Sequence, residues 1–252
     1  MHNSNSLDAA PQDSSMGLLA SSQGWRVVNV RPPAIAKALL YDPQAPWMGI
    51  TLGILLVSVP VFFEAPLVRT APWIAVLLTG VWVGSSLYLC RHRRTEFLGD
   101  LLWGLSWSWL AGAIYWGWFR WEPLWHLPIE AIGLPMALWG IYRRWRPVGH
   151  WFYLGSLLGT AVTDMYFYQM DLMPHWRRLM SAPPSETMAI VAASFTQIQT
   201  TAGVGIAVGC ASVLLALSWL SGRSPQRHHW LFSGTLIGTL LVDGLFVVLA
   251  SR

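Results

Sequence analysis

Charged side chains are scarce in this sequence, and that scarcity is the first indication of its class. Asp, Glu, Lys and Arg make up 11% of its 252 residues, whereas hydrophobic residues make up 54%. A soluble domain usually carries about 25% charged residues. The deficit is too large for a surface of this size in contact with water, so the sequence predicts a membrane protein.

Lysine and cysteine are nearly absent as well. Lys37 is the single lysine beside fifteen arginines, which occur in short clusters between apolar runs. That pattern is typical of the flanks of membrane helices and does not indicate nucleic-acid binding. Cys90 and Cys210 are too few for a disulfide framework or a cysteine metal site. Because Walker, HExxH, GxSxG and CxxC motifs are also missing from the sequence, it predicts no metal site and carries no common catalytic signature.

Seven apolar segments meet or approach the length that a membrane helix needs, which is about 20 residues. They cover residues 47–68, 72–90, 97–118, 124–142, 150–168, 203–220 and 230–250. The sequence therefore predicts an all-α, polytopic bundle of about seven transmembrane helices, formed by residues 34–252 as one domain. Residues 1–33 begin with a polar stretch and are predicted to be a disordered cytoplasmic tail.

The segment 187–220 is too long for one span. As a single helix it would reach about 51 Å, whereas the hydrocarbon core is about 30 Å thick. Its first part, residues 187–202, contains Gln197 and Gln199. We interpret this part as a helix that lies at the interface or against the bundle, and the sequence leaves open whether it enters the membrane.

The distribution of Lys and Arg predicts the orientation of the bundle. One side of the seven-span topology collects eleven of these residues: Arg26, Arg31, Lys37, Arg91, Arg93, Arg94, Arg143, Arg144, Arg146, Arg223 and Arg227. The other side has five: Arg69, Arg120, Arg177, Arg178 and Arg252. Because basic residues favour the cytoplasmic side, the N-terminus is predicted to be cytoplasmic and the C-terminus to lie outside.

Acidic residues and histidines gather on the side opposite the arginine clusters. The candidates for an acidic cavity in the outer leaflet are Glu64, Glu122, His126, Glu130, Asp164, Asp171, His175 and Asp243. The candidate ion-pair partners are Arg69, Arg120, Arg177 and Arg178. Ionisable groups within spans are costly and usually face the bundle interior or a wet cavity. The pattern fits ion pairs that fix helix packing as well as it fits a cavity that binds a ligand, moves protons or hosts acid–base chemistry.

The fourth apolar segment contains three prolines, Pro123, Pro128 and Pro135. Each removes a backbone N–H, which predicts a kinked helix beside a cavity. His126 and Glu130 lie four residues apart, so they share one helical face. An imidazole at this position could also ligate haem or chlorophyll, although hydrogen bonding is the more common use of such a histidine.

Three stretches carry a resemblance to a known family: TDMYFYQMDLMPHWRRLM at residues 163–180, HLPIEAIGLP at residues 126–135 and LVDGLF at residues 241–246. They resemble the DUF3120 family of cyanobacterial integral membrane proteins, a domain of unknown function. The resemblance implies a cyanobacterial source and a thylakoid or plasma membrane, and it implies no activity. The LPIE segment also resembles the proline–acid motif of membrane-embedded lycopene cyclases, but Ala131 stands where those enzymes have a second acid.

Two classes of function remain open on this basis. The first is an accessory factor that assembles or stabilises a photosynthetic complex, or that carries a pigment or cofactor such as chlorophyll, haem or a carotenoid. The second is an intramembrane enzyme or transporter that acts through the acidic cavity on a lipophilic substrate (isoprenoid, pigment or quinone) or on a small ion. The lack of a recognised catalytic set, and the setting that the family implies, favour the first class.

Overall fold

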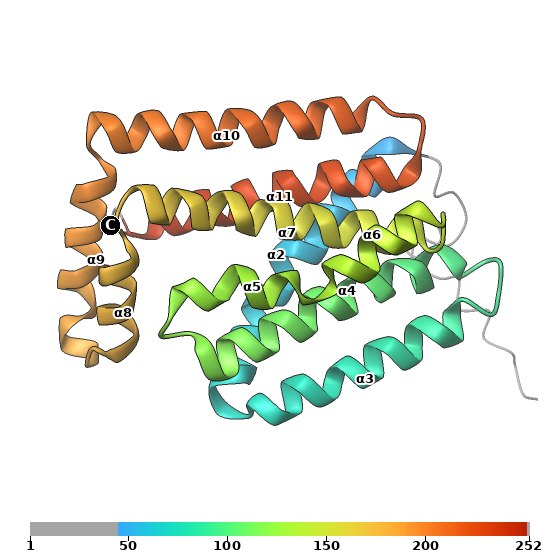
Figure 1. Ribbon diagram of the computed structural model, residues 1–252, viewed down its shortest axis with the longest axis horizontal. Helices are drawn as coiled ribbons and strands as arrows, with labels where there is room; N and C mark the ends of the chain where they lie inside the picture. Colours follow the sequence, from blue (N-terminus) through green and yellow to red (C-terminus); the bar gives the residue numbers. More distant parts are fainter. Residues whose placement is uncertain (1–44, 251–252) are drawn as a thin grey trace, which may run out of the picture.

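The described part of the chain is a bundle of helices joined by short turns. The computed structural model describes residues 45–250, drawn in colour in Figure 1. In chain order the elements are α2 (Pro46–Thr70), α3 (Pro72–Leu89), α4 (Glu96–Ile114), η1 (Tyr115–Phe119), η2 (Pro123–Trp125), α5 (His126–Glu130), η3 (Ala131–Gly133), α6 (Leu134–Tyr142), α7 (Pro147–Gln169), α8 (Met173–Ser181), α9 (Pro184–Ile198), α10 (Thr201–Gly222) and α11 (Arg227–Ala250). The prediction of an all-α chain is confirmed for these residues. Residues 1–33, predicted to be a tail, lie outside them.

Each of the seven predicted segments coincides with helical structure. Within residues 45–250, five helical stretches are long and apolar enough to cross a membrane: Pro46–Thr70, Pro72–Leu89, Pro123–Tyr142, Thr201–Gly222 and Arg227–Val248. The stretch Pro123–Tyr142, called the fourth segment below, runs from η2 to α6. Helices of this length and composition are those of a membrane protein.

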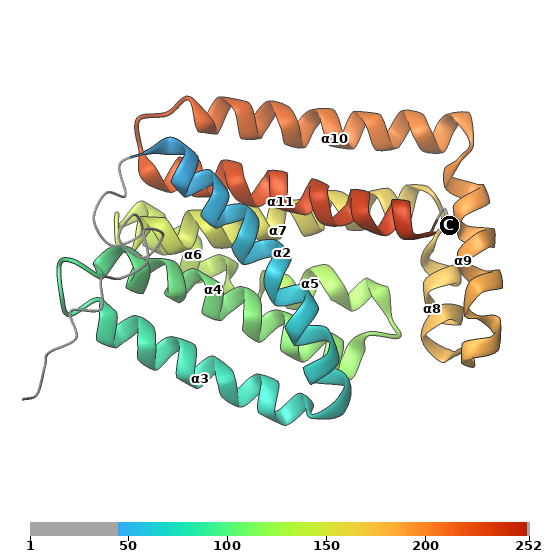
Figure 2. The same ribbon diagram turned by 180° about the vertical axis from the view of Figure 1, so that it is seen from behind.

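Helices α4 and α7 are not among these five, and they lie in the middle of the bundle. Figures 1 and 2 show both of them with neighbouring helices on either side. Their buried residues include small and polar ones, such as Gly104 and Ser106 on α4 and Gly149 and His150 on α7. Side chains that face other helices need not be apolar, and small residues there allow close packing.

Helices α8 and α9 lie across one end of the bundle (Figure 1). The chain then turns at Gln199 and Thr200 and enters α10, which runs back along the bundle. The Thr200 hydroxyl accepts a hydrogen bond from the Gly203 amide at 3.1 Å, which caps the start of α10. Two helices of different direction therefore share the segment 187–220, which explains its excess length.

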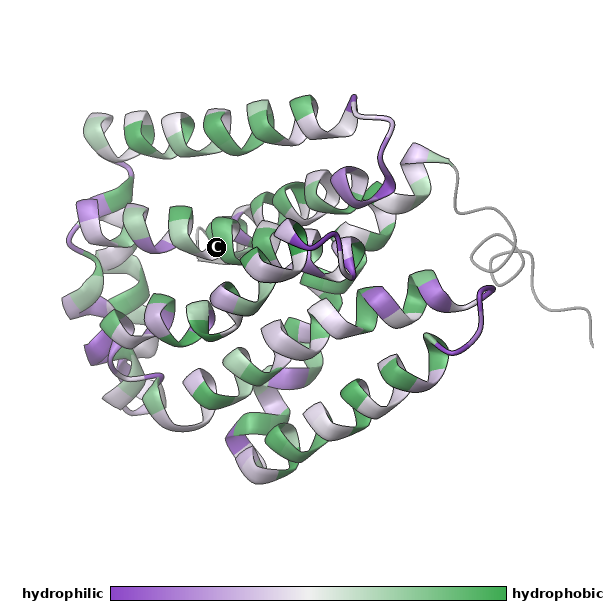
Figure 3. Cartoon of the chain, turned by 45° about the vertical axis from the view of Figure 1, so that its right-hand side comes forward, coloured by the Kyte–Doolittle hydropathy of each residue, from purple (hydrophilic) through white to green (hydrophobic). Residues whose placement is uncertain are grey.

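Hydrophilic residues gather at both ends of the bundle, as the hydropathy colours of Figure 3 show. At one end lie the turns from α3 to α4, from α6 to α7 and from α10 to α11, and we call it the arginine-rich end. Its arginines are Arg91, Arg93, Arg94, Arg143, Arg144, Arg146, Arg223 and Arg227. The opposite end carries α8 and α9, and we call it the α8–α9 end.

Glycines bring the backbones of α2 and α11 into contact where the two helices cross. A Cβ atom at Gly53 of α2 would lie 2.6 Å from the carbonyl oxygen of Leu231 on α11. A Cβ atom at Gly234 of α11 would collide with the carbonyl oxygen of Ile50 on α2. Neither position has room for a side chain, so glycine is required at both for this close approach.

Helix α4 caps the start of α7, and this cap joins the two helices. The carboxylate of Asp100 on α4 accepts hydrogen bonds from the amides of Val148 at 3.0 Å and Gly149 at 2.9 Å. These amides lie in the first turn of α7, where the helix offers them no carbonyl partner. Gly104 of α4 packs directly on the Gly149 backbone, and a Cβ atom at Gly104 would collide with it.

Helix α11 also packs closely on α7, so the tight contacts form one continuous row. A Cβ atom at Gly155 of α7 would collide with the Thr235 hydroxyl of α11, and one at Gly159 would collide with the Thr239 hydroxyl. The row runs from α2 through α11 and α7 to α4. Helices α3 and α10 and the fourth segment pack on the outside of this row.

We expect Gly234→Ala to destabilise the protein by about 1–3 kcal/mol, as overpacking of a closely packed site does. Gly205→Ala in α10 is the matched control, because a Cβ atom there would meet nothing within 4 Å. Thermal unfolding of the purified variants in mild detergent measures the difference. Equal unfolding midpoints for the two variants would contradict the close contact between α2 and α11.

Candidate functional site

Prolines break the fourth segment into short pieces. Between Pro123 and Tyr142 the chain passes through the 3-10 turn η2, the five-residue helix α5, the 3-10 turn η3 and α6. Pro128 and Pro135 lack the N–H that would hydrogen bond to the preceding turn. The segment is thus interrupted, as its prolines predict. This course places His126 and Glu130 near the α8–α9 end, beside α7.

His126 lies between two carboxyl groups. Its Nδ1 atom is 2.9 Å from Oδ1 of Asp164 on α7, which is a hydrogen bond. Its Nε2 atom is 4.0 Å from Oε1 of Glu130, one turn further along the fourth segment. Both ring nitrogens therefore face carboxyl oxygens. Only Nδ1 forms a hydrogen bond, because Nε2 lies beyond hydrogen-bonding distance of Glu130.

Aromatic rings enclose His126 on its other sides. The Tyr115 ring lies against the imidazole, with 4.2 Å between centroids and an angle of 31° between planes. The Trp116 ring meets the imidazole edge-on at 6.4 Å. Both aromatic residues belong to η1, a single π-helical turn that ends α4. Such turns are rare and occur frequently at functional sites, and sequence analysis missed this one because a π turn has no compositional signal.

Tyr153 of α7 holds the backbone beside Glu130. Its hydroxyl donates a hydrogen bond to the Glu130 carbonyl oxygen at 2.6 Å and accepts one from the Gly133 amide at 3.1 Å. These backbone groups are left open by the break after α5, and a neighbouring helix must satisfy them within a membrane. Sequence analysis missed Tyr153, because nothing in its local pattern distinguishes it from an ordinary buried aromatic residue.

Two further carboxyl groups extend the site toward α11 and α2. Asp243 of α11 accepts a hydrogen bond from the Thr163 hydroxyl at 2.8 Å and interacts electrostatically with Asp164. Glu64 of α2 interacts electrostatically with Glu130. The Oε1 atom of Glu64 is buried and has no hydrogen-bond partner among the described residues.

We call these five residues the acidic cluster: Glu64, His126, Glu130, Asp164 and Asp243. They come from four parts of the bundle, α2, α5, α7 and α11. Within residues 45–250, no lysine or arginine forms an ion pair with them. Because unpaired charge is costly away from water, four carboxyl groups and one imidazole require bound protons or a bound cation for charge balance.

The four arginines that were predicted as partners lie outside the acidic cluster. Arg69 and Arg178 are exposed. The Arg120 guanidinium donates a hydrogen bond to the Trp116 carbonyl oxygen at 3.1 Å. Arg177 alone pairs with a predicted acid, Glu122, through hydrogen bonds of 2.8 and 3.1 Å at the surface.

Three of the predicted acidic or histidine residues also lie apart from the cluster. Glu122 pairs with Arg177 as described, and Asp171 is exposed in the turn after α7 with a φ angle of 51°. His175 of α8 contacts Gln197 of α9, with 2.9 Å between Nε2 and Oε1. Glu122 thus connects α8 to the turn before η2, and His175 connects α8 to α9.

Helix α8 covers the acidic cluster at the end of the bundle. The Trp176 indole donates a hydrogen bond to the Arg120 carbonyl oxygen at 2.7 Å, and its ring packs edge-on against Trp116 at 5.7 Å. Trp116 in turn contacts His126. The ion pair between Arg177 and Glu122 fastens the same helix to the turn before η2.

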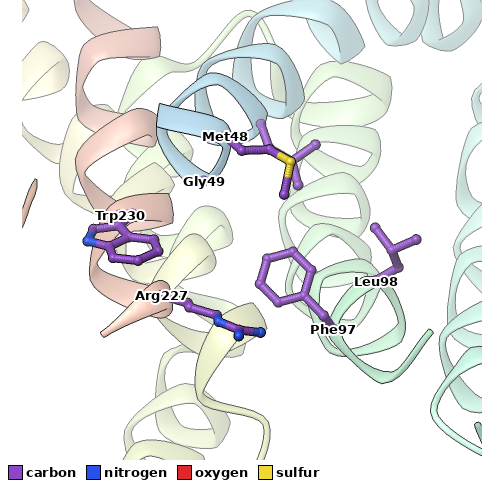
Figure 4. A pocket seen from close by; sticks show the side chains of 7 residues that line it. Met48, Gly49, Phe97, Leu98, Arg227 and Trp230 are labelled. Carbon is purple, nitrogen blue, oxygen red and sulfur yellow. The ribbon is translucent and has the colours of Figure 1, made fainter. Parts of the chain in front are cut away.

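A small pocket lies at the arginine-rich end, away from the acidic cluster (Figure 4). It is lined by Met48, Gly49, Leu52, Phe97, Leu98, Arg227 and Trp230. Its interior of about 10 Å³ is about the room that one water molecule needs. This pocket is therefore too small to serve as a substrate site.

Lowering the pH should loosen α8. Hydrogen bonds from Arg177 keep the pKa of Glu122 below its ordinary value of 4.5. The stabilisation from this pair is therefore present above pH 4.5 and is lost as the pH falls through the lowered pKa. A spin label at Ser181→Cys, in a protein without its two native cysteines, should become more mobile between about pH 7 and about pH 3.

Two variants show whether this effect belongs to the Glu122–Arg177 pair. In Glu122→Gln the spin label should be mobile already at neutral pH, and acid should change its mobility little. Arg178→Gln is the control, because Arg178 is exposed and forms no ion pair among the described residues. An acid response that persists in full in Glu122→Gln would show that another group is responsible.

Comparison with known proteins identifies the family of the chain. The family model described as "Protein of unknown function (DUF3120)" matches residues 53–251. The chain matches no curated protein and no solved structure in the corresponding searches. The matched range contains all five residues of the acidic cluster and most of the described helices. The resemblance found in the sequence is confirmed, and the chain belongs to the DUF3120 family.

Proposed function

We propose that this protein crosses the membrane seven times, with its N-terminus in the cytoplasm. Figures 1 and 2 support this topology, because the seven helical segments run between the same two ends of the bundle. Helix α7 has 23 residues and is about 35 Å long at 1.5 Å per residue, enough for a core of about 30 Å. Of the described arginines, eight lie at the arginine-rich end and four at the other, and basic residues favour the cytoplasmic side.

We further propose that the acidic cluster binds and releases protons and that this couples to the movement of a small ion across the membrane. The observation that carries the proposal is the position of His126 between Asp164 and Glu130, with no arginine or lysine paired to them among the described residues. Chains of Asp, Glu and His within a membrane are typical of proton relays in pumps and transporters. Because Asp164 and Glu130 both lie beside His126, a change in the charge of one of the three groups affects the other two.

The way in which the cluster is built favours transport over catalysis. Its members connect separate spans, so a change of protonation alters the contacts between helices and not only a local site. Two of these spans contain prolines close to the cluster, Pro60 and Pro66 in α2 and Pro128 in the fourth segment. Interrupted helices beside the ion site are a recurrent feature of secondary transporters.

The remaining expectations from the sequence stay predictions. These are the cyanobacterial source, the thylakoid or plasma membrane, and a role as an accessory, assembly or pigment-handling factor of a photosynthetic complex. An enzymatic role on an isoprenoid-like substrate stays a prediction too. The contacts of the acidic cluster support proton-linked ion movement more directly than any of these roles.

Replacement of Asp164 or Glu130 should abolish proton movement. The test uses liposomes that contain the protein and the pH-sensitive dye pyranine, with sodium, potassium or chloride supplied in turn as the co-ion. We expect the wild-type protein to acidify the lumen faster than protein-free liposomes after an external pH drop. Asp164→Asn and Glu130→Gln should lower the protein-dependent rate by about tenfold or more, because each removes a carboxyl group of the relay.

Asp171→Asn is the matched control, because it removes an exposed carboxyl group at the same end, in the turn after α7 and outside the acidic cluster. Size-exclusion elution and the unfolding midpoint show whether each variant is folded, and Glu64→Gln replaces any variant that is not. Proton movement by Asp164→Asn and Glu130→Gln at the wild-type rate would refute the proposed function. So would a wild-type rate no greater than that of protein-free liposomes with every co-ion.

Labelling from the two sides of the membrane tests the proposed topology. In a protein whose Cys90 and Cys210 are replaced, Arg144→Cys should react with a membrane-impermeant maleimide only from the cytoplasmic side. Arg177→Cys should react only from the opposite side, because α8 lies at the other end of the bundle. Labelling of Arg144→Cys from outside would show that the orientation or the number of spans is wrong.

A further inference from the structure

A groove lies on the outward face of α3, at the edge of the bundle. It is a shallow, largely open hollow lined by Gly84, Ser85, Tyr88 and Leu89, in the last two turns of this one helix. A Cβ atom at Gly84 would meet nothing within 4 Å, so the missing side chain helps to form the hollow. Helix α3 lies at the border of the bundle in Figures 1 and 2, so the groove opens away from the other helices.

The groove belongs to an apolar stripe that ends at an arginine. Leu77, Val81, Gly84 and Tyr88 follow one another at spacings of three or four residues, which places them along one side of the helix, and Arg91 follows in the turn after it. The side chains of Leu77, Val81 and Tyr88 are 72%, 55% and 61% exposed. Within a membrane this stripe faces lipid chains, and its arginine lies at headgroup level.

Basic side chains follow the stripe where α3 ends. Arg91, Arg93 and Arg94 in the turn from α3 to α4 are exposed, and residues 90–95 form the basic rim beside the groove. On the buried side of α3, the Arg146 guanidinium donates a hydrogen bond to the Ser86 hydroxyl at 2.9 Å and so joins the loop from α6 to α7 to this helix.

The lack of pairing in this rim favours a ligand from outside the chain. The exposed arginines of the rim form no ion pair within residues 45–250, so their charge is available to an anion.

We propose that this site binds one molecule of an acidic phospholipid. Its phosphate and headgroup contact Arg91, Arg93 and Arg94, and one acyl chain lies in the groove at Gly84 and Tyr88. A lipid fits the site better than free phosphate does, because the basic rim continues directly into an apolar groove on a surface that faces the bilayer. Basic pockets at helix ends are a known mode of recognition for acidic lipid headgroups. This proposal is independent of the function proposed for the acidic cluster.

Native mass spectrometry of the full-length protein in mild detergent tests the proposal. The protein is titrated with phosphatidylglycerol, with phosphatidylcholine of the same acyl chains, and with inorganic phosphate. We expect phosphatidylglycerol to bind about tenfold more tightly than phosphatidylcholine, because the headgroups differ in net charge. We expect no binding of inorganic phosphate over the same range of concentration.

Variants separate the headgroup site from the groove. The triple change Arg91→Gln, Arg93→Gln and Arg94→Gln should remove the preference for phosphatidylglycerol. Gly84→Leu should weaken the binding of both lipids, because its side chain fills the groove where space is open. The change Arg223→Gln with Arg227→Gln is the control, because it removes two arginines from the same end at the turn from α10 to α11.

Three outcomes would overturn the proposal. Equal affinity for the two lipids would show that charge does not select the ligand. A loss of preference in the Arg223→Gln, Arg227→Gln control as large as that in the triple variant would show only a general attraction to a basic surface. Competition by inorganic phosphate at the lipid's concentration would indicate an anion site and not a lipid site. An unchanged unfolding midpoint in each variant shows that the fold is retained.

Discussion

Direct backbone contact between helices is the interaction on which this bundle depends. In a lipid environment the hydrophobic effect gives helices little reason to associate, so close packing and hydrogen bonds must hold them together. Here Gly53 and Gly234 join α2 to α11, and Gly104 and Gly149 join α4 to α7. These glycine contacts concentrate toward the arginine-rich half. The ionisable residues of the acidic cluster occupy the other half, where side chains separate the helices.

The division between a tightly packed half and a polar half explains how the protein accommodates ionisable residues, whose burial costs free energy. The acidic cluster is supported from several sides: Asp164 fixes His126, Tyr153 fixes the backbone at Glu130, and Thr163 binds Asp243. All three supports come from α7, the helix that α4 caps and that α11 packs against. Helix α8 lies beside the site at the end of the bundle, where its Trp176 contacts Trp116.

Much of the fold could be predicted from the sequence, because each span leaves an apolar run of the right length. The break in segment 187–220 followed from length alone, and the interruptions of the fourth segment followed from its prolines. The spacing of His126 and Glu130 predicted their shared face.

The contact of His126 with Asp164 could not be predicted, because the two lie 38 residues apart and their meeting depends on how the helices pack. The same reason applies to the supporting hydrogen bonds of Tyr153. The arginine partners were predicted from charge alone, and only Arg177 pairs with an acid among the described residues.

The cap that Asp100 provides for α7 has a mechanical consequence. It locks α4 to α7 by hydrogen bonds, while glycines and threonines lock α7 to α11 and α11 to α2. These four helices are therefore joined in one continuous frame of close contacts. The fourth segment lies outside the frame, carries two of the five cluster residues and is divided by prolines into pieces shorter than a normal helix. Tyr153 of α7 ties this divided segment to the frame, so moving the segment to separate His126 from Asp164 would also break the hydrogen bonds at Glu130 and Gly133.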